Sequence, residues 1–225
     1  MPAKNVLKLY VKGGYYHIYN RGVEKRIIFQ DKQDYSVFLS FLKEYLSPKE
    51  ELIKTLFTLK GESFKGVPHQ NKNYFENIKL ICYCLMPNHF HLLINQSAEK
   101  AVENFMRSLA TRYSMYFNKK YDRIGSLFQG PYKAVLVTDD TYLLHLSRYI
   151  HLNPSEYADD LEKEYSSYTE YLRKRKTTWI NPEIILKFFE NNTNKEFQKF
   201  NSYQKFVEEY KKDSSEILGR LTLED

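Results

Sequence analysis

The stretch FENIKLICYCLMPNHFHLLINQ, residues 75–96, is the most informative part of the sequence about the fold, because it contains two strand patterns joined by a turn. In the first strand, apolar residues alternate so that two sets point to opposite faces. We expect one set to be Ile78, Leu80, Cys82 and Cys84, and the other to be Ile81, Tyr83 and Leu85. Pro87 and Asn88 form the turn, and HFHLLINQ is the second strand. Residues 75–96 therefore predict two consecutive strands of one sheet.

The segments on either side of this stretch complete the fold. Before it, alternation predicts a strand over 15–22, and helical spacing predicts a helix over 31–46. After it, a helix over 101–121, a strand over 127–137 and a helix over 141–153 follow. This order predicts an α+β fold with a ferredoxin-like (RRM-like) antiparallel sheet and helices on one face.

Residues 47–76 do not fit this order and predict an insertion. The stretch 51–60 is compatible with a short helix or a strand, and the polar, turn-rich stretch 61–73 predicts an exposed segment. We expect a catalytic domain over 1–157 that carries this insertion. A helical extension follows over 158–225, with helical spacing in NPEIILKFFE and SYQKFVEEYKK.

Charge and composition point to an anionic partner. The 225 residues carry a net charge of +6, but residues 1–154 have 22 basic and 13 acidic side chains, whereas the remainder is net negative. Aromatic residues make up 16% of the chain and are interleaved with cations over 101–133, a combination that suits unstacked bases. The alternative interpretation is a solvated charged face over an aromatic core.

The sequence gives no sign of a membrane or secreted protein. No apolar run is long enough for a membrane helix, and the first residues lack the pattern of a signal peptide. Cys82 and Cys84 are too close for an ordinary disulfide. We therefore expect a cytoplasmic protein with reduced cysteines.

Two pairs of residues are candidates for chemistry. His89 and His91, two apart on a strand, place both imidazoles on one face, where they could bind a divalent metal or simply be polar surface residues. Tyr149 and Asn153, four apart on a helix, also share a face. They could supply a nucleophilic hydroxyl and an amide ligand, or else pack and cap the helix before Pro154.

Together these motifs resemble the HUH single-tyrosine transposases. MPNHFHLL (86–93), YIHLNP (149–154), YHIYNRG (16–22) and GSLFQGPYKAVLV (125–137) are most similar to the REP-associated tyrosine transposase branch, and the resemblance covers about 10–157. It implies that His89, His91 and Asn153 bind one Mg²⁺ or Mn²⁺. It also implies that Tyr149 attacks the scissile phosphate and forms a 5′-phosphotyrosine.

The resemblance further implies a partner, single-stranded DNA that forms hairpins, and a monomer or homodimer. Basic residues that could contact the DNA backbone are numerous in the predicted catalytic domain. They are Arg21, Lys25, Arg26, Arg107, Arg112, Lys119, Lys120, Arg123 and Lys133.

Other functions remain open at this point. A non-catalytic RRM-like module that binds single-stranded nucleic acid would share the fold and the composition, but it would not need Tyr149 or the paired histidines. Replication or conjugation HUH nucleases differ in motif order or use paired tyrosines. A domesticated transposase would have the same motifs.

Overall fold

A four-stranded antiparallel sheet lies at the centre of the computed structural model, which describes residues 8–49, 55–66, 71–190 and 200–209. The strands lie in the order β4-β5-β1-β6, and neighbouring strands are antiparallel. Their bounds are β1 Tyr15–Arg21, β4 Ile78–Met86, β5 His89–Gln96 and β6 Lys133–Val137. The predicted α+β, ferredoxin-like fold class is confirmed.

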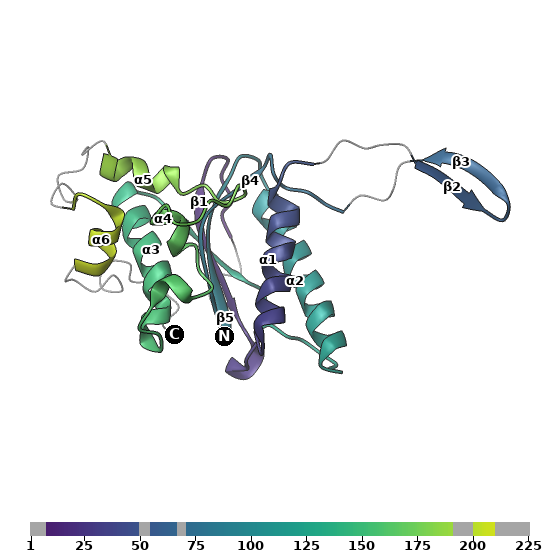
Figure 1. Cartoon of the computed structure of the whole chain (residues 1–225), viewed down its shortest axis with the longest axis horizontal. Coiled ribbons are helices and arrows are strands. Elements are labelled where there is room, and N and C mark those ends of the chain that lie inside the picture. The colour runs from purple at the N-terminus through teal and green to yellow at the C-terminus, as the bar shows by residue number, and fades with distance from the viewer. Residues whose placement is uncertain (1–7, 50–54, 67–70, 191–199, 210–225) are drawn as a thin grey trace.

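Two long helices cover one face of the sheet (Figure 1). They are α1 (Lys32–Leu46) and α2 (Ala101–Lys120), close to the predicted ranges. The Asp31 carboxylate begins α1 by accepting a hydrogen bond from the Asp34 backbone N–H. Apolar residues of both helices pack against alternate strand residues such as Ile18 and Phe90, which are buried.

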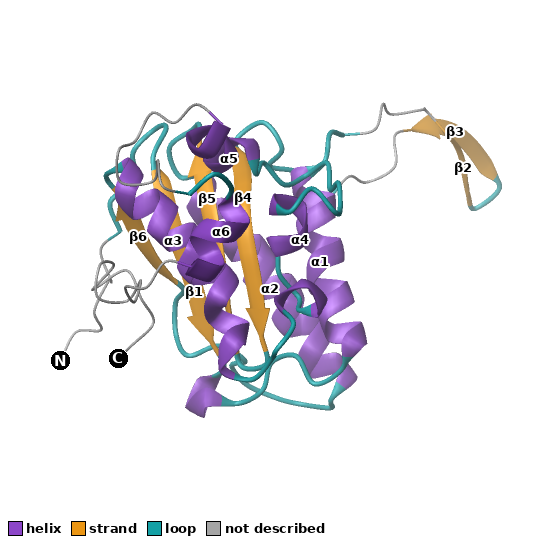
Figure 2. Ribbon diagram, turned by 60° about the vertical axis from the view of Figure 1, so that its left-hand side comes forward, coloured by secondary structure: helices purple, strands orange, loops and turns teal. Residues whose placement is uncertain are grey.

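The opposite face is covered by α3 (Asp140–Leu152) and by helices that follow it (Figures 1 and 2). The prediction that the helices lie on one face of the sheet was therefore wrong, although the predicted fold class is correct. Every residue of β4 except Lys79 is buried. A strand that is apolar on both faces needs cover on both, and α3 provides it by contacting β4 and β5.

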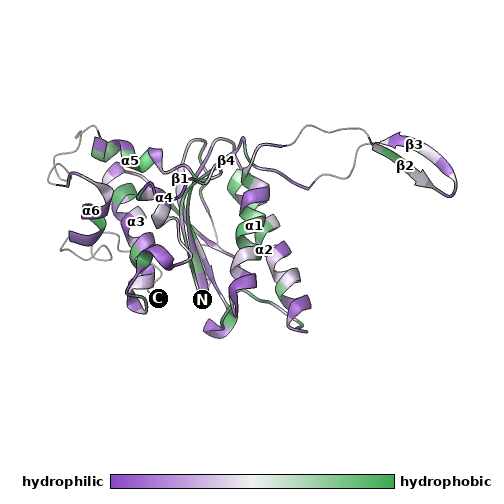
Figure 3. Ribbon diagram, in the orientation of Figure 1, coloured by the Kyte–Doolittle hydropathy of each residue, from purple (hydrophilic) through white to green (hydrophobic). Residues whose placement is uncertain are grey.

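The described part of the C-terminal segment packs on the same sheet and on α3. Ile180 forms an isolated bridge with Leu80, and Ser166 forms one with Cys84. The helices in this segment carry hydrophobic residues among hydrophilic ones, as α5 shows in Figure 3. The remaining helical elements of the described residues are η1 Val23–Lys25, η2 Asn153–Glu156, η3 Leu161–Lys163, α4 Tyr168–Tyr171, α5 Glu183–Glu190 and α6 Tyr203–Glu209.

A β-bulge in β4 changes which residues face which helices. The pairing with β5 shifts between Leu80 and Cys82, so that Ile81 is the extra residue. Beyond the bulge, the alternation is reversed: Tyr83 packs with the α1–α2 face, whereas Cys84 packs with the α3 face. The two predicted sets were thus wrong for the second half of the strand, because simple alternation assumes a regular ladder. Both cysteines are free and buried.

The insertion contains a separate two-stranded sheet that lies away from the rest of the molecule (Figure 1). Its strands are β2 Thr55–Leu59 and β3 Glu62–Gly66. Lys60 and Gly61 both have positive φ angles, which suit a two-residue hairpin turn. Of the two interpretations of 51–60, a strand is confirmed for its described part, and 50–54 and 67–70 lie outside the described residues. No helix in the described residues combines the length and hydropathy needed to cross a membrane.

Candidate active site

His89 and His91 lie at the start of β5 and project from the face that α3 covers. Their ring centroids are 5.0 Å apart and the rings are perpendicular. His91 is fully buried and His89 is partly buried, whereas Phe90 between them packs into the α1–α2 core. Because His91 is buried, the interpretation of these histidines as polar surface residues is wrong for His91.

The helix α3 brings Tyr149 and Asn153 to the same place. The Asp139 carboxylate caps the start of α3 by accepting from the Tyr142 N–H at 3.0 Å. Near its end, the half-buried ring of Tyr149 stands perpendicular to the ring of His91, with centroids 5.5 Å apart. The Asn153 side-chain amide donates to the Tyr149 carbonyl at 2.8 Å. All four residues that were predicted as metal ligands or nucleophile thus lie together between β5 and α3.

Burial keeps the two histidines neutral. It lowers the pKa of His89 to about 4 and the pKa of His91 well below its usual range. The neighbouring Asn153 side chain raises the pKa of both histidines, but by less than burial lowers it, and the nearby Arg21 lowers the pKa of His89 further. Neutral imidazole is the form that binds metals, so both rings are in that form near pH 7.

The donor set fits a divalent metal. His91 Nε2 is buried and has no hydrogen-bond partner within the described residues. A buried nitrogen of this kind is costly unless a ligand satisfies it. His89 and the Asn153 amide lie beside it, which provides two imidazole nitrogens and an amide oxygen. A larger set of three or more histidine, cysteine or carboxylate side chains is absent from the described residues.

The family model for "Transposase IS200 like" matches residues 10–153, which include all four of these residues. The chain belongs to the IS200-like transposase family. The predicted single-tyrosine transposase family is therefore confirmed.

Among the solved structures that match this transposase, a REP-associated tyrosine transposase bound to a REP hairpin is similar to it in fold. It has a TM-score of 0.54 at 10% identity, over 76% of this chain and 87% of that one. Another, a candidate transposase from Deinococcus radiodurans R1, has a TM-score of 0.36 at 14% identity, over 66% of this chain and 95% of that one. No curated protein sequence matches the chain.

Some of the basic residues of this transposase lie at the end of the sheet where the histidines are. Arg21 ends β1 opposite His89, and its Nε donates to Gln129 Oε1 at 2.6 Å. Lys25 and Arg26 follow in the η1 loop, and Lys133 begins β6 on the histidine face. A hollow of about 490 Å³ lies next to this loop. Its lining residues are Arg26, Ile27, Gln30, Phe117 and Arg123.

Three other basic residues are engaged in ion pairs on α2. Arg112 pairs with Glu44 at 2.8 Å, and Arg107 pairs with Glu103 one helical turn away. Lys120 pairs with Asp31 and with the fully buried Asp34, both at 2.7 Å. Tyr116 and Tyr121 also donate to Asp34, so Lys120 belongs to a network that joins α1 to α2. Lys119, by contrast, is exposed.

Sequence reasoning did not single out His17. This residue lies on β1, is fully buried, and has its Nε2 2.9 Å from His91 Nδ1. Alternation along 15–22 places it opposite Tyr16 and Ile18. That pattern alone could not connect it with His91, because the contact depends on β1 lying beside β5 in the sheet.

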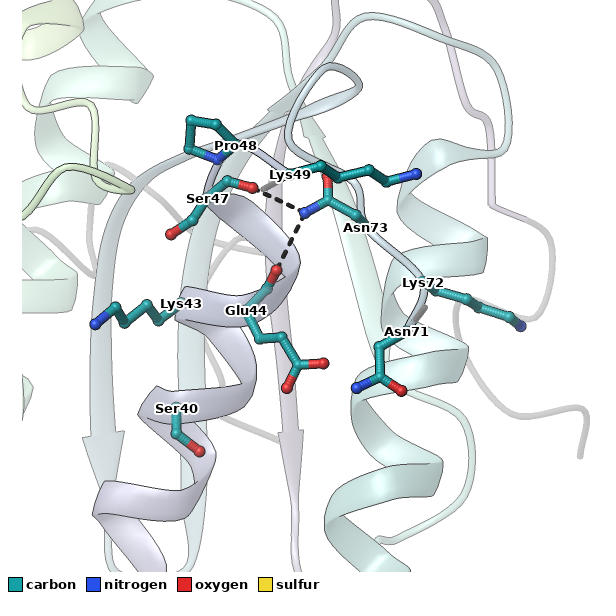
Figure 4. Close-up of a pocket in the computed structure, with 9 residues that line it drawn as sticks. All are labelled: Ser40, Lys43, Glu44, Ser47, Pro48, Lys49, Asn71, Lys72 and Asn73. Atoms are coloured by element: carbon teal, nitrogen blue, oxygen red, sulfur yellow. Dashed lines mark hydrogen bonds between the residues drawn. The ribbon is translucent and has the colours of Figure 1, made fainter. Parts of the chain in front are cut away.

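A second hollow, of about 370 Å³, lies at the far end of α1 and contains none of the site residues (Figure 4). Asn73 closes one side of it by donating to the carbonyls of Glu44 and Ser47 at 3.1 and 2.8 Å. Lys43 points away from Lys49 and Lys72 in Figure 4, so the three ammonium groups do not converge on one ligand.

Proposed function

We propose that this transposase cleaves and rejoins single-stranded DNA, with Tyr149 as the nucleophile. The observation that carries the proposal is the meeting of Tyr149 and Asn153 with His89 and His91 in a single chain. A phenol beside a metal-binding set suits phosphoryl transfer, and an RRM-like module that only binds nucleic acid would have no use for it.

The residues divide the reaction between them. His89, His91 and Asn153 would hold one Mg²⁺ or Mn²⁺, which supplies Lewis-acid stabilisation of the scissile phosphate when bound. The Tyr149 hydroxyl loses its proton and attacks phosphorus, which forms the Tyr149 O–P bond. The P–O3′ bond breaks, and the 3′-oxygen takes up a proton and leaves. The product is a 5′-phosphotyrosine, whose bond energy is then used to join a second 3′-hydroxyl.

The path of the DNA is proposed from the basic residues near the site. Arg21, Lys25, Arg26, Arg123 and Lys133 would contact the backbone of the strand that enters at this end of the sheet. Arg107, Arg112 and Lys120 are less suited, because each has a close carboxylate partner, whereas the contact of Arg26 with the exposed Glu24 is long, at 3.7 Å. Lys119 remains a proposed contact. A hairpin-forming substrate is supported by the fold's similarity to a transposase that binds a REP hairpin.

The site is proposed to act within one chain. The Tyr149 ring contacts the His91 ring of the same molecule, so the nucleophile need not come from a second copy. A monomer would therefore suffice for cleavage.

Labelled single-stranded oligonucleotides incubated with Mn²⁺ test the reaction class. We expect a covalent protein–DNA band that requires the metal and disappears in Tyr149→Phe, while hairpin binding is retained. Tyr142→Phe is the matched control, since Tyr142 lies on the same helix but is exposed. Full cleavage by Tyr149→Phe would refute the assignment.

A further inference from the structure

The two metal-binding imidazoles of the proposed site are each held through Nδ1. His89 Nδ1 lies 2.6 Å from Asn88 Oδ1, and because an amide oxygen can only accept, His89 Nδ1 carries the proton. This arrangement leaves His89 Nε2 with its lone pair available. The partner of His91 Nδ1 is the Nε2 of His17, at 2.9 Å, with the two rings nearly parallel.

Either His17 or His91 can donate the hydrogen bond between them, and the two cases have opposite consequences for metal binding by His91. If His17 donates, the proton of neutral His91 sits on Nε2, which then cannot bind a metal. If His91 donates through Nδ1, its Nε2 keeps a lone pair. Only when His91 donates does it have the same tautomer as His89, with the proton on Nδ1.

The surroundings of His91 Nε2 favour the second case, in which His91 donates. The atom is buried without a hydrogen-bond partner in the described part of the chain. In proteins, a buried N–H without an acceptor is rarer than a buried acceptor without a donor. The Asn153 amide N–H is directed to the Tyr149 carbonyl, and the Asn153 amide oxygen, although close to His91, does not form a hydrogen bond with Nε2.

We propose that His17 is a positioning residue: its Nε2 accepts the hydrogen bond from His91 Nδ1 and so keeps the His91 Nε2 lone pair free for the divalent metal. The inference rests on the metal site of the proposed function and adds to it a residue from a third element, β1. Metal-binding histidines are commonly oriented in this way by a second residue, and loss of such a partner typically weakens metal binding about 10–100-fold.

The tautomer of His91 in the metal-free wild-type protein is the first test. Two-bond ¹H–¹⁵N NMR spectra distinguish a protonated from an unprotonated ring nitrogen, and the chain has only six histidines. The His91 signals are assigned by their loss in His91→Gln. We expect protonated Nδ1 and unprotonated Nε2. A proton on Nε2 would overturn the proposal, and this result needs no variant of His17.

The second test compares two substitutions of His17 by Mn²⁺ calorimetry without DNA. His17→Leu fills the space but cannot accept a hydrogen bond, and we expect the affinity to fall about 10–100-fold. His17→Gln offers an amide oxygen to His91 Nδ1, and we expect affinity within a few-fold of wild type. Equal losses in both variants, with melting temperatures equally lowered, would make His17 a packing residue and overturn the proposal.

These measurements separate the inference from the proposed function. Tyr149→Phe should keep both the His91 tautomer and the Mn²⁺ affinity. A protein that shows both but forms no covalent DNA adduct would refute the proposed reaction and leave the role of His17 standing. A wild-type protein that binds no Mn²⁺ would overturn the role of His17 directly, whatever its activity on DNA.

Discussion

His89, His91 and Asn153 contribute unequally to the proposed metal site. The two imidazoles are stronger ligands for Mn²⁺ than an amide oxygen, which water can replace. We therefore expect His89→Ala and His91→Ala each to abolish cleavage and to lower Mn²⁺ affinity by more than tenfold, with a smaller loss for Asn153→Ala. Calorimetry without DNA measures the affinity. Unchanged Mn²⁺ binding by the double histidine variant would contradict the site.

Among the basic residues, ion pairing separates those free to bind DNA from those that hold the fold. Arg26 and Arg123 line one hollow beside the η1 loop. Arg26 has a long contact of 3.7 Å with the exposed Glu24, and Arg123 donates to the Asn118 amide oxygen rather than to a carboxylate. We expect Arg26→Ala and Arg123→Ala together to weaken binding of single-stranded DNA. The salt slope, which is the slope of the logarithm of the binding constant against the logarithm of salt concentration, should become shallower by about one or more.

Lys120→Ala is the matched comparison for the arginine pair. Its loss leaves the buried Asp34 carboxylate without its ammonium partner. We expect a lower melting temperature and little change in the salt dependence of DNA binding, as measured by fluorescence anisotropy over a range of salt concentrations. A salt slope that falls as much in Lys120→Ala as in an arginine variant would show that the ion pair opens to bind DNA.

At the scale of elements, sequence patterns could predict the parts of the site that lie on one element. The spacing of His89 and His91 on a strand, and of Tyr149 and Asn153 on a helix, follows from regular geometry. Sequence patterns could not predict the features that depend on contacts between different elements. His17 meets His91 only through strand order, and the role of Lys120 follows from the packing of α1 on α2.

The helix α3 is tied to the C-terminal segment by a buried histidine. His151 Nδ1 lies 2.8 Å from Tyr203 Oη on α6, and its Nε2 lies 2.8 Å from Ser167 Oγ. Tyr203 also donates to Ser147 on α3. These contacts connect the helix that carries Tyr149 to the segment after 158, so the stability of the two is coupled.

Burial of His151 makes this connection sensitive to pH. Burial lowers the pKa of His151 to about 3, against about 6.5 in an unfolded chain. Between these values, the unfolded state binds one more proton than the folded state. The free energy of unfolding should therefore fall as pH drops below about 6.5, by up to about 1.4 kcal/mol per pH unit for this group alone.

Urea denaturation at pH 7, 6, 5 and 4 measures this dependence. His91, which is buried, and His89, which is partly buried, should add to the slope in the same direction, because the pKa of each is also lowered. In His151→Gln, whose amide can still bond with Tyr203 or Ser167, we expect the slope to decrease by about one proton. A slope that is unchanged in this variant would mean that His151 does not titrate during unfolding.

At the scale of the whole molecule, the sheet is enclosed on both faces, and the proposed site lies inside one of these layers at its edge. Part of the cover comes from the acidic C-terminal segment, which differs in charge from the basic N-terminal part of the chain. Composition could show this difference in charge, but it could not show that both parts share one core. The reason is that apolar residues on α5 and α6 are typical of any amphipathic helix.

The form of the DNA substrate is the property that tests the molecule as a whole. We expect a single strand to reach the partly buried Tyr149, because its bases are free to unstack, whereas the bases of a duplex are already paired and stacked. The described fold is a ferredoxin-like sheet and contains no helix-turn-helix or zinc-ligand set for reading a duplex groove. We expect cleavage of single-stranded DNA and none of a blunt duplex of the same sequence.

Binding should weaken steeply with salt as phosphate contacts release counterions. Matched substrates in one cleavage assay decide the point: equal cutting of both forms would favour an ordinary metal-dependent nuclease over a single-strand transposase.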